Sequence, residues 1–319
     1  MEPVAEKIEP TAERFSNPVA TYLAATRPPF ILASVVPILL GLGFAVYQGH
    51  PLNAVNAVLT LLAGILLHAA VNVLNDYYDA LNGTDDLNTE RIYPFTGGSR
   101  FIQNGVLTRQ QMRNFGFGLV LLVTAIGAYL MMQSGMALFW LGLAGLVLGW
   151  GYSAPPLRLN SRGLGELAVL AGFGLLPLGA FFVQTGELSW RLLLVALPSA
   201  LLTTNLLYIN QFPDRKADLA AGKRHWVARL EPATAAWGYP LIASLAWSVF
   251  ILSMAFGLLP WPAAVAALPA LLSFRAAGMV LRHAERPREL APAIRMTILA
   301  MLGHGALLAA VLAWSGSPS

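Results

Sequence analysis

Residues 68–88, HAAVNVLNDYYDALNGTDDLN, combine a hydrophobic run with a cluster of acids at its end. On a helix, residues three and four positions apart lie on one face. The spacing therefore predicts one polar stripe on an otherwise apolar helix, made of His68, Asn72, Asp76 and Asp79. Such a stripe could bind a cation or a polar substrate at one end of the helix.

A second polar stripe lies in NQFPDRKAD, where Asn210, Asp214 and Asp218 recur at a spacing of four. Pro213 falls inside this stripe and is expected to kink or end the helix there. A solvated helix end would account for a single acid. Ionisable groups in or near a membrane are costly and usually mark a pathway or a site, so two clusters of Asn and Asp favour a functional site.

The chemistry of these side chains points to a hard cation and a phosphate. Grouped carboxylates repel one another and are stable only beside a compensating cation. The chain has no Cys and no clustered His, so its oxygen-rich set fits Mg²⁺ better than zinc or copper. Mg²⁺ often binds carboxylates together with substrate phosphates. The bases that could clamp phosphate oxygens are Arg91, Arg100, Lys223 and Arg224.

The composition requires that membrane-spanning helices position these residues. Of the 319 residues, 56% are hydrophobic and 11% charged, whereas soluble proteins have about 25% charged residues. A span needs about 20 apolar residues. The sequence predicts nine spans, at 28–48, 54–80, 114–133, 136–153, 163–184, 190–212, 234–258, 260–282 and 292–314. We therefore expect a polar segment at 1–21, without a signal-peptide pattern, and one transmembrane domain at 22–319.

The distribution of basic residues predicts the orientation. Cytoplasmic loops carry an excess of Lys and Arg, and of the 20 basic residues only Arg191 falls on the side opposite the rest. The N-terminus is therefore expected in the cytoplasm and the C-terminus outside, in a bacterial-type inner membrane. The long inner connections, 81–113 and 213–233, bring both acid clusters to the cytoplasmic mouth. Because the charge serves orientation, we expect no nucleic-acid partner.

The two stripes resemble known motifs. NVLNDYYDALNGTDD resembles the first aspartate motif of the UbiA superfamily of membrane prenyltransferases, and NQFPDRKADLAAGKR resembles its second. RIYP, GGS, YSAPPLRLNSRGLGE and FFVQTGE are most similar to the menaquinone branch, the 1,4-dihydroxy-2-naphthoate prenyltransferases. The resemblance covers roughly residues 25–230, and the last three spans match in hydropathy only. It implies nine transmembrane helices around a central cavity capped by cytoplasmic loops.

The resemblance also implies roles for individual residues. One Mg²⁺ would be held by Asp76, Asp79 and Asp85, and another by Asp214 and Asp218. The residues expected to bind metal or diphosphate are Asn72, Asn75, Arg91, Asn210 and Lys223. The acceptor would be bound near Tyr152, Arg158 and Glu166, although the first two could equally be interfacial anchors. Gln211 and Pro213 depart from the commoner Asn and Arg of the second motif, and Asp86 is an extra acid.

The implied reaction joins a polyprenyl diphosphate to an aromatic acceptor within the lipid bilayer. The expected acceptor is 1,4-dihydroxy-2-naphthoate, which would lose its carboxylate; 4-hydroxybenzoate and homogentisate are alternatives. A CDP-alcohol phosphotransferase would need a DG-x-x-AR motif, and the chain has no Asp-Gly pair. A cation-coupled transporter would prefer acids near the membrane midplane. Structural roles are expected for His50, His225, His283 and His304. The pair Thr108 and Gln111 predicts a capping box at the start of the third span.

Overall fold

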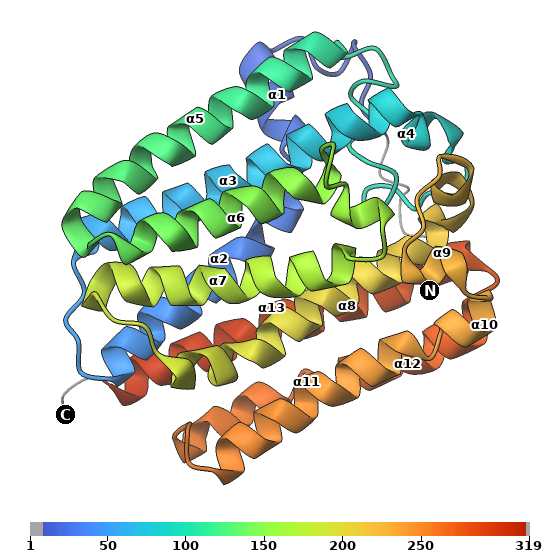
Figure 1. Ribbon diagram of the computed structural model, residues 1–319. Helices are drawn as coiled ribbons and strands as arrows, with labels where there is room; N and C mark the ends of the chain where they lie inside the picture. The colour runs from blue at the N-terminus through green and yellow to red at the C-terminus, as the bar shows by residue number, and fades with distance from the viewer. Residues whose placement is uncertain (1–8, 317–319) are drawn as a thin grey trace.

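Long helices that run side by side make up the computed structural model, which describes residues 9–316 (Figure 1). Within these residues every regular element is a helix. The elements of the first half are α1 (Pro18–Ala25), α2 (Pro28–Tyr47), α3 (Ala54–Asn82), α4 (Thr84–Leu87), α5 (Arg109–Ser134), α6 (Ala137–Ser153) and η1 (Leu159–Ser161). Those of the second half are α7 (Gly165–Thr185), α8 (Trp190–Ala220), α9 (Trp226–Arg229), α10 (Pro232–Ala235), α11 (Gly238–Ala255), η2 (Trp261–Ala267), α12 (Ala270–His283), η3 (Pro287–Leu290) and α13 (Ala291–Ser315).

The protein is an integral membrane protein. In the described part of the chain, eight helical segments are long and apolar enough to cross a membrane. The predicted count of nine is one higher, because α6 is apolar but has only 17 residues, fewer than the roughly 20 that a span needs. Every predicted span nevertheless coincides with a helix of the structure.

The two helices that carry the acids extend further than the sequence predicts. α3 continues to Asn82, and α8 continues through Pro213 to Ala220. Pro213 therefore does not end the helix, which was one of the two outcomes that the sequence predicted. Pro removes one helical hydrogen bond, but neighbouring helices can compensate for this loss in a membrane protein, and α8 packs against α7, α11 and α13. As a result, Asp214 and Asp218 lie on a helix rather than in a loop.

Local sequence explains how the acid-bearing helices begin and pack. The side chain of Asn53 accepts a hydrogen bond from the backbone of Asn56 and caps α3, and Ser189 caps α8 in the same way. The predicted capping box at α5 is confirmed. α2 lies between α3, α7 and α13. Gly41 permits a close approach of α2 to α7, because a Cβ there would lie 2.3 Å from the carbonyl oxygen of Pro177.

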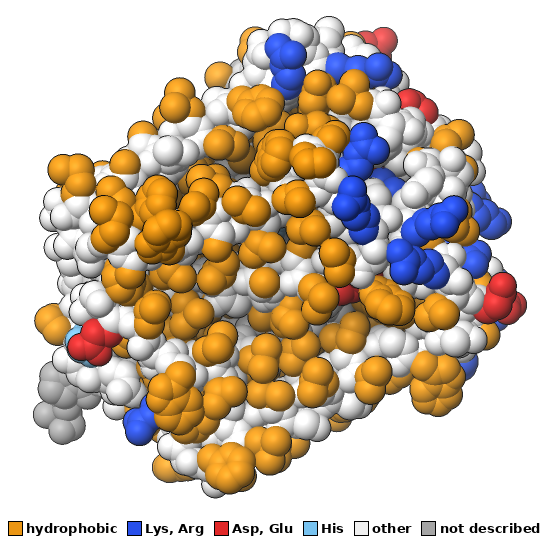
Figure 2. Space-filling view, in the orientation of Figure 1, with side chains coloured by type: hydrophobic (Ala, Val, Ile, Leu, Met, Phe, Trp, Pro, Cys, Tyr) orange, Lys and Arg blue, Asp and Glu red, His pale blue; other side chains and the backbone are white. Residues whose placement is uncertain are grey.

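The two ends of the molecule differ in polarity. Glu9 contacts the loop between α4 and α5, whereas Gly316 lies against the last residues of α2, at the opposite end. The short helices α4, α9 and α10 gather at the first end (Figure 1). Figure 2 shows hydrophobic side chains across the middle of the molecule and most of the visible Lys and Arg side chains near α9. This is the arrangement that a membrane imposes on a protein with its polar loops on one side.

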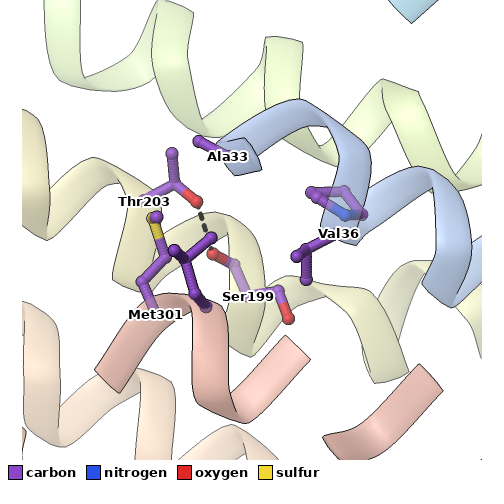
Figure 3. A pocket seen from close by; sticks show the side chains of 7 residues that line it. Ala33, Val36, Ser199, Thr203 and Met301 are labelled. Atoms are coloured by element: carbon purple, nitrogen blue, oxygen red, sulfur yellow. Dashed lines mark hydrogen bonds between the residues drawn. The ribbon is translucent and has the colours of Figure 1, made fainter. Parts of the chain in front are cut away.

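A small apolar gap lies between α2, α8 and α13, away from the acids (Figure 3). Its lining is mainly aliphatic. The polar side chains there are Ser199 and Thr203, and the Thr203 hydroxyl donates to the Ser199 carbonyl oxygen at 2.9 Å. With its hydroxyl bonded inside its own helix, Thr203 offers no donor to a substrate, so the gap is a packing feature of the apolar layer.

Candidate active site

Backbone groups of the loop between α4 and α5 fix the carboxyl groups of the first acid motif. Asp76 lies near the end of α3 with 3% of its surface exposed, and Asp85 on α4 is equally buried. The Ser99 N–H donates to both Asp76 carboxylate oxygens, at 3.3 and 3.2 Å. Gly98 has a φ of +74°, and a Cβ there would lie 2.6 Å from Asp85 Oδ2 and 3.0 Å from Asp76 Oδ1. Only glycine lets this loop pass between the two carboxyl groups.

One ammonium group joins the two motifs. Lys223 Nζ lies 2.8 Å from Asp79 Oδ1, on α3, and 3.2 Å from Asp218 Oδ1, on α8. All three side chains are buried. Residues 139 positions apart in sequence (218 minus 79) therefore meet at one cation. The two polar stripes therefore face each other at Asp79 and Asp218.

Asp218 has a second partner that the sequence did not predict. His225 Nε2 lies 3.0 Å from Asp218 Oδ2. His225 Nδ1 accepts a hydrogen bond from the Ala228 N–H at 3.2 Å, so Nδ1 carries no proton and Nε2 is the nitrogen that donates. His225 thus caps α9 and fixes the carboxylate at the same time, which adds a site contact to its expected structural role.

The charges of this cluster shift the pKa values of Lys223 and Asp85. Burial disfavours the charged form of Lys223, but the carboxylates of Asp79 and Asp218 outweigh burial and raise the pKa of Lys223 above its ordinary value. Burial, together with the nearby carboxylates of Asp79 and Asp76, raises the pKa of the Asp85 carboxyl well above its usual range. Asp79 and Asp218 therefore have a cation in contact, whereas Asp85 has no ion-pair partner among the described residues.

Asp214 is bound by a loop residue, Asn88, whose Nδ2 donates to Asp214 Oδ1 at 2.6 Å. Among the described residues, the buried oxygens at this end that have no hydrogen-bond partner include Asp85 Oδ2, Asn88 Oδ1 and Asn210 Oδ1. Carboxylate and amide oxygens are ligands suited to a hard divalent cation. Within residues 9–316, however, no three acidic or His side chains converge closely enough to form a metal cage by themselves. The donors fit such an ion only together with ligand oxygens.

Other predicted residues form a polar path beside the first motif. Asn75 Nδ2 donates to Asp79 Oδ2 at 3.2 Å and to Ser153 Oγ at 2.8 Å, which links α3 to the end of α6. Asn72 donates to the Thr26 carbonyl oxygen at 3.0 Å. The ring of Tyr152 lies 3.6 Å from the position that a Cβ on Gly165 would take.

Glu166 pairs with a residue that the sequence analysis noted only as a departure from the family pattern. Gln211 Nε2 donates to Glu166 Oε1 at 2.9 Å, from α8 to α7. Both side chains are buried. This places Glu166 beside the second motif rather than on the surface of the inner loop.

Two predicted bases are engaged elsewhere. Arg91 contacts Glu9, with Nη2 at 2.6 Å from Oε1, and Arg158 is exposed on the loop before η1. Arg100 donates to the Asp85 carbonyl oxygen at 2.5 Å, so it holds the α4 backbone. The structure therefore does not bring Arg91 or Arg158 to the acid cluster, and of the predicted bases only Lys223 contacts the acids.

Sequence reasoning missed contacts made by loop residues: Asn88, Ser99 and His225. The GGS and GKRH segments were the only available signals, because their side chains have no helical spacing that predicts a common face. Arg27, the residue before α2, also contacts the loop between α4 and α5. Its Nη2 donates to the Phe95 carbonyl oxygen at 3.2 Å, and so Arg27 ties the start of α2 to the loop over Asp76.

Comparison with known proteins gives consistent results. The sequence model of the UbiA prenyltransferase family matches residues 34–314, so the resemblance extends through the last three helices and not only to about residue 230. The chain is 30% identical over 297 residues to the 1,4-dihydroxy-2-naphthoate octaprenyltransferase of Mycobacterium tuberculosis, covering 92% of this chain and 97% of the relative.

A second relative and a solved structure agree. The 2-carboxy-1,4-naphthoquinone phytyltransferase of Synechocystis sp. is 28% identical over 305 residues, covering 92% of this chain and 94% of the relative. A UbiA homolog from Archaeoglobus fulgidus bound to GPP and Mg²⁺ shares the fold, with a TM-score of 0.59 and 16% identity, covering 91% of this chain and 100% of that chain.

Proposed function

Because this chain belongs to the UbiA prenyltransferase family, we propose that it transfers a polyprenyl group from an allylic diphosphate to 1,4-dihydroxy-2-naphthoate, as in menaquinone biosynthesis. The protein is an enzyme, a prenyltransferase of the membrane. The names of the relatives support a naphthalene acceptor. The observation that carries the proposal is Lys223, whose ammonium contacts both Asp79 and Asp218. A diphosphate and its cations need this combination of charges.

We propose Mg²⁺ as the cofactor. Its donors would be Asp76, Asp79 and Asp85 for one ion and Asp214 and Asp218 for another. The unpartnered oxygens of Asp85, Asn88 and Asn210 support this assignment, as does the structural relative that was solved with GPP and Mg²⁺. When bound, Mg²⁺ supplies positive charge that stabilises the leaving diphosphate.

The other residues of the motifs would position the diphosphate. Lys223 would donate to its oxygens, because an ammonium has three donors and only two are engaged by Asp79 and Asp218. Asn72 and Asn210 would add amide contacts, and Asn75 would hold Asp79 in place. His225 would keep the carboxylate of Asp218 in one orientation. These groups stabilise charge that develops on the leaving group as the allylic C–O bond breaks.

The bond changes of the proposed reaction balance without an additional reagent. The ring carbon that bears the carboxylate forms a C–C bond to the allylic carbon, and the C–O bonding pair leaves with the diphosphate. The carboxylate then departs as CO₂, and its C–C bonding pair restores the aromatic ring. The product is a prenylated dihydroxynaphthalene, the reduced form of a demethylmenaquinone.

The direct test uses purified protein with Mg²⁺ and radiolabelled polyprenyl diphosphates of several lengths. The acceptors are 1,4-dihydroxy-2-naphthoate, 4-hydroxybenzoate and homogentisate. We expect label in a lipid-soluble product and release of CO₂ with the naphthoate only. Transfer to a benzenoid acceptor but not to the naphthoate would refute the acceptor, and transfer to none of the three would refute the proposed function.

We also propose that the acid cluster faces the cytoplasm of a bacterial-type inner membrane, with the C-terminus outside. The support is the charge asymmetry, with Arg191 as the only base of the opposite side. Because the chain has no Cys, single cysteines report topology cleanly. Cysteines at the exposed positions Asp86 and Arg224 should be labelled by an impermeant maleimide only from the cytoplasmic side, and those at Gln133 and Glu187 only from outside. The opposite pattern would refute this orientation.

A further inference from the structure

Glu166 and Gln211 form a buried polar pair that the diphosphate chemistry does not use. Glu166 lies in the first turn of α7 and Gln211 near the inner end of α8. They are joined by the 2.9 Å hydrogen bond from Gln211 Nε2 to Glu166 Oε1. Only 8% of Glu166 and 7% of Gln211 is exposed. A buried polar pair is costly unless its hydrogen-bonding groups are satisfied.

The pair is only half satisfied. Glu166 Oε2 and Gln211 Oε1 are buried and have no hydrogen-bond partner among residues 9–316. Both atoms are oxygens, one of an amide and one of a carboxyl group, and both can accept a hydrogen bond. Leaving a buried acceptor unpaired is costly. A ligand that brings O–H donors would remove this cost, whereas an anionic group such as a carboxylate or phosphate would be repelled.

The pair also lies next to the proposed reaction centre. Gln211 follows Asn210 directly and precedes Asp214 by three residues on the continuous helix α8. Glu166 follows Gly165, whose missing Cβ leaves room for the ring of Tyr152 and for Asn160. Asn160 and Asn75 both donate to Ser153 Oγ, at 3.4 and 2.8 Å. A chain of hydrogen bonds therefore runs from Asn160, which lies against Gly165 beside the pair, through Ser153 and Asn75 to Asp79.

We propose that Glu166 and Gln211 bind a phenolic hydroxyl of the aromatic acceptor and thereby set its orientation. This inference rests on the proposed function. One of the two unpartnered oxygens accepts the hydrogen of the hydroxyl at ring position 4, and the acceptor carboxylate at position 2, which has no hydrogen to donate, points away from the pair. The pair therefore orients the acceptor, while the proton stays on the acceptor oxygen.

Steady-state kinetics of Gln211→Met and Glu166→Gln test this assignment. Met has nearly the volume of Gln but neither its donor nor its acceptor, so the KM for the acceptor should rise about tenfold. The KM for the polyprenyl diphosphate should stay within about twofold of the wild-type value, because the variant leaves the aspartates and Lys223 in place. The matched control is Thr204→Val, a buried position on α8 whose hydroxyl bonds only to the Ala200 carbonyl oxygen. It should change neither KM.

Acceptor analogues distinguish hydroxyl recognition from a merely structural role. Wild-type enzyme should prefer 1,4-dihydroxy-2-naphthoate over 1-hydroxy-2-naphthoate, which lacks the 4-hydroxyl, by at least about 100-fold in kcat/KM, because the missing hydroxyl leaves the buried oxygens unpaired. In Gln211→Met and Glu166→Gln this preference should fall below about tenfold. Equal preference in the wild type and both variants would overturn the inference.

A binding measurement without the diphosphate separates this inference from the proposed function. The naphthoate alone should raise the melting temperature of the wild-type protein and of Thr204→Val, but not that of either pair variant. An identical shift in all four proteins would overturn the hydroxyl site even if prenyl transfer is confirmed. Conversely, wild-type protein that prenylates none of the acceptors would refute the proposed function. If Gln211→Met does not fold, Gln211→Asn, which keeps the amide but withdraws it from Glu166, takes its place in the same measurements.

Discussion

The two acid motifs are held by different parts of the chain. In the first motif, the Ser99 backbone N–H spans the Asp76 carboxylate, and Gly98 passes between Asp76 and Asp85. In the second motif, side chains hold the acids: Asn88 donates to Asp214, and His225 and Lys223 contact Asp218. The first motif thus depends on the conformation of a loop, and the second on individual side chains.

This difference assigns different tasks to the two motifs. A backbone N–H and a glycine turn cannot rotate away, so the first motif has a fixed geometry with an unpartnered oxygen on Asp85. Lys223 is a flexible side chain and can exchange a carboxylate for a diphosphate oxygen without a change of fold. We infer that the first motif is the rigid part of the site and that the second contains its adaptable cation. Substitutions that affect only one motif test this division.

Removing one acid from either motif should have the largest effect. Asp76→Asn and Asp214→Asn each keep the size of the side chain but remove a charge that the proposed cations need. We expect each variant to lose at least about 100-fold in kcat, while membrane insertion and melting temperature stay near the wild-type values. Single-turnover transfer of a labelled prenyl group measures the loss.

The matched control for these two variants is Asp86→Asn. Asp86 is adjacent to Asp85 but exposed, so its activity should remain within about twofold of wild type. Near-normal activity of either Asp76→Asn or Asp214→Asn would show that one motif suffices and would refute the two-motif site.

A single methyl group should disable the first motif without changing an acid. In Gly98→Ala the new Cβ would meet Asp85 Oδ2 at 2.6 Å, and alanine is strained at a φ of +74°. We expect a loss of roughly tenfold or more in activity and a lower apparent affinity for Mg²⁺, since the loop must move away from both carboxyl groups. Gly105→Ala is the control, because its φ is +68° but nothing lies within 4 Å of its Cβ. If both variants behave alike, only backbone strain matters, and the fixed geometry of the first motif is refuted.

Lys223→Ala should disrupt the contact between the two motifs. It removes the cation between Asp79 and Asp218, and hydrogen bonds to charged groups contribute about 1.5–3 kcal/mol. We expect the KM for the diphosphate to rise at least about tenfold. The increase in melting temperature on adding Mg²⁺ should be larger than in the wild type, because an added cation would then separate two uncompensated carboxylates. An unchanged KM and an unchanged response to Mg²⁺ would exclude Lys223 from the site.

The sequence predicts the acids that lie on helices better than it predicts the loop residues that contact them. Asp76 and Asp79, or Asp214 and Asp218, share a face because helical spacing is a local property. The positions of Ser99, Asn88 and His225 depend on how loops fold back over the helix ends, and no local spacing encodes that. The sequence does not show that α8 continues through Pro213, because tertiary packing decides this. Gln211 was visible only as a departure from the family pattern, and its partner Glu166 comes from another helix.

The smallest expected effect concerns the anchor of the first motif's loop. Glu9 binds Arg91 through Oε1, at 2.6 and 2.7 Å, while its Oε2 accepts from Asn104 at 3.3 Å. The second motif has no corresponding contact with the N-terminal segment among the described residues. Glu9 therefore ties the segment before α1 to the loop that carries Gly98, and its loss should loosen the first motif alone.

Glu9→Gln keeps the shape of the side chain and removes its charge. We expect a loss of about 1 kcal/mol in stability, because the ion pair is partly exposed, and a rise of about twofold in the KM for the diphosphate. Trypsin should cleave after Arg91 and Arg100 faster than in the wild type, since both side chains lose an anchor. The control is Glu13→Gln, which replaces an exposed acid of the same segment. Trypsin should cleave this variant at the wild-type rate. A fall in KM would instead mean that Glu9 withholds Arg91 from the diphosphate, and the N-terminal segment would then compete with the substrate rather than support the rigid motif.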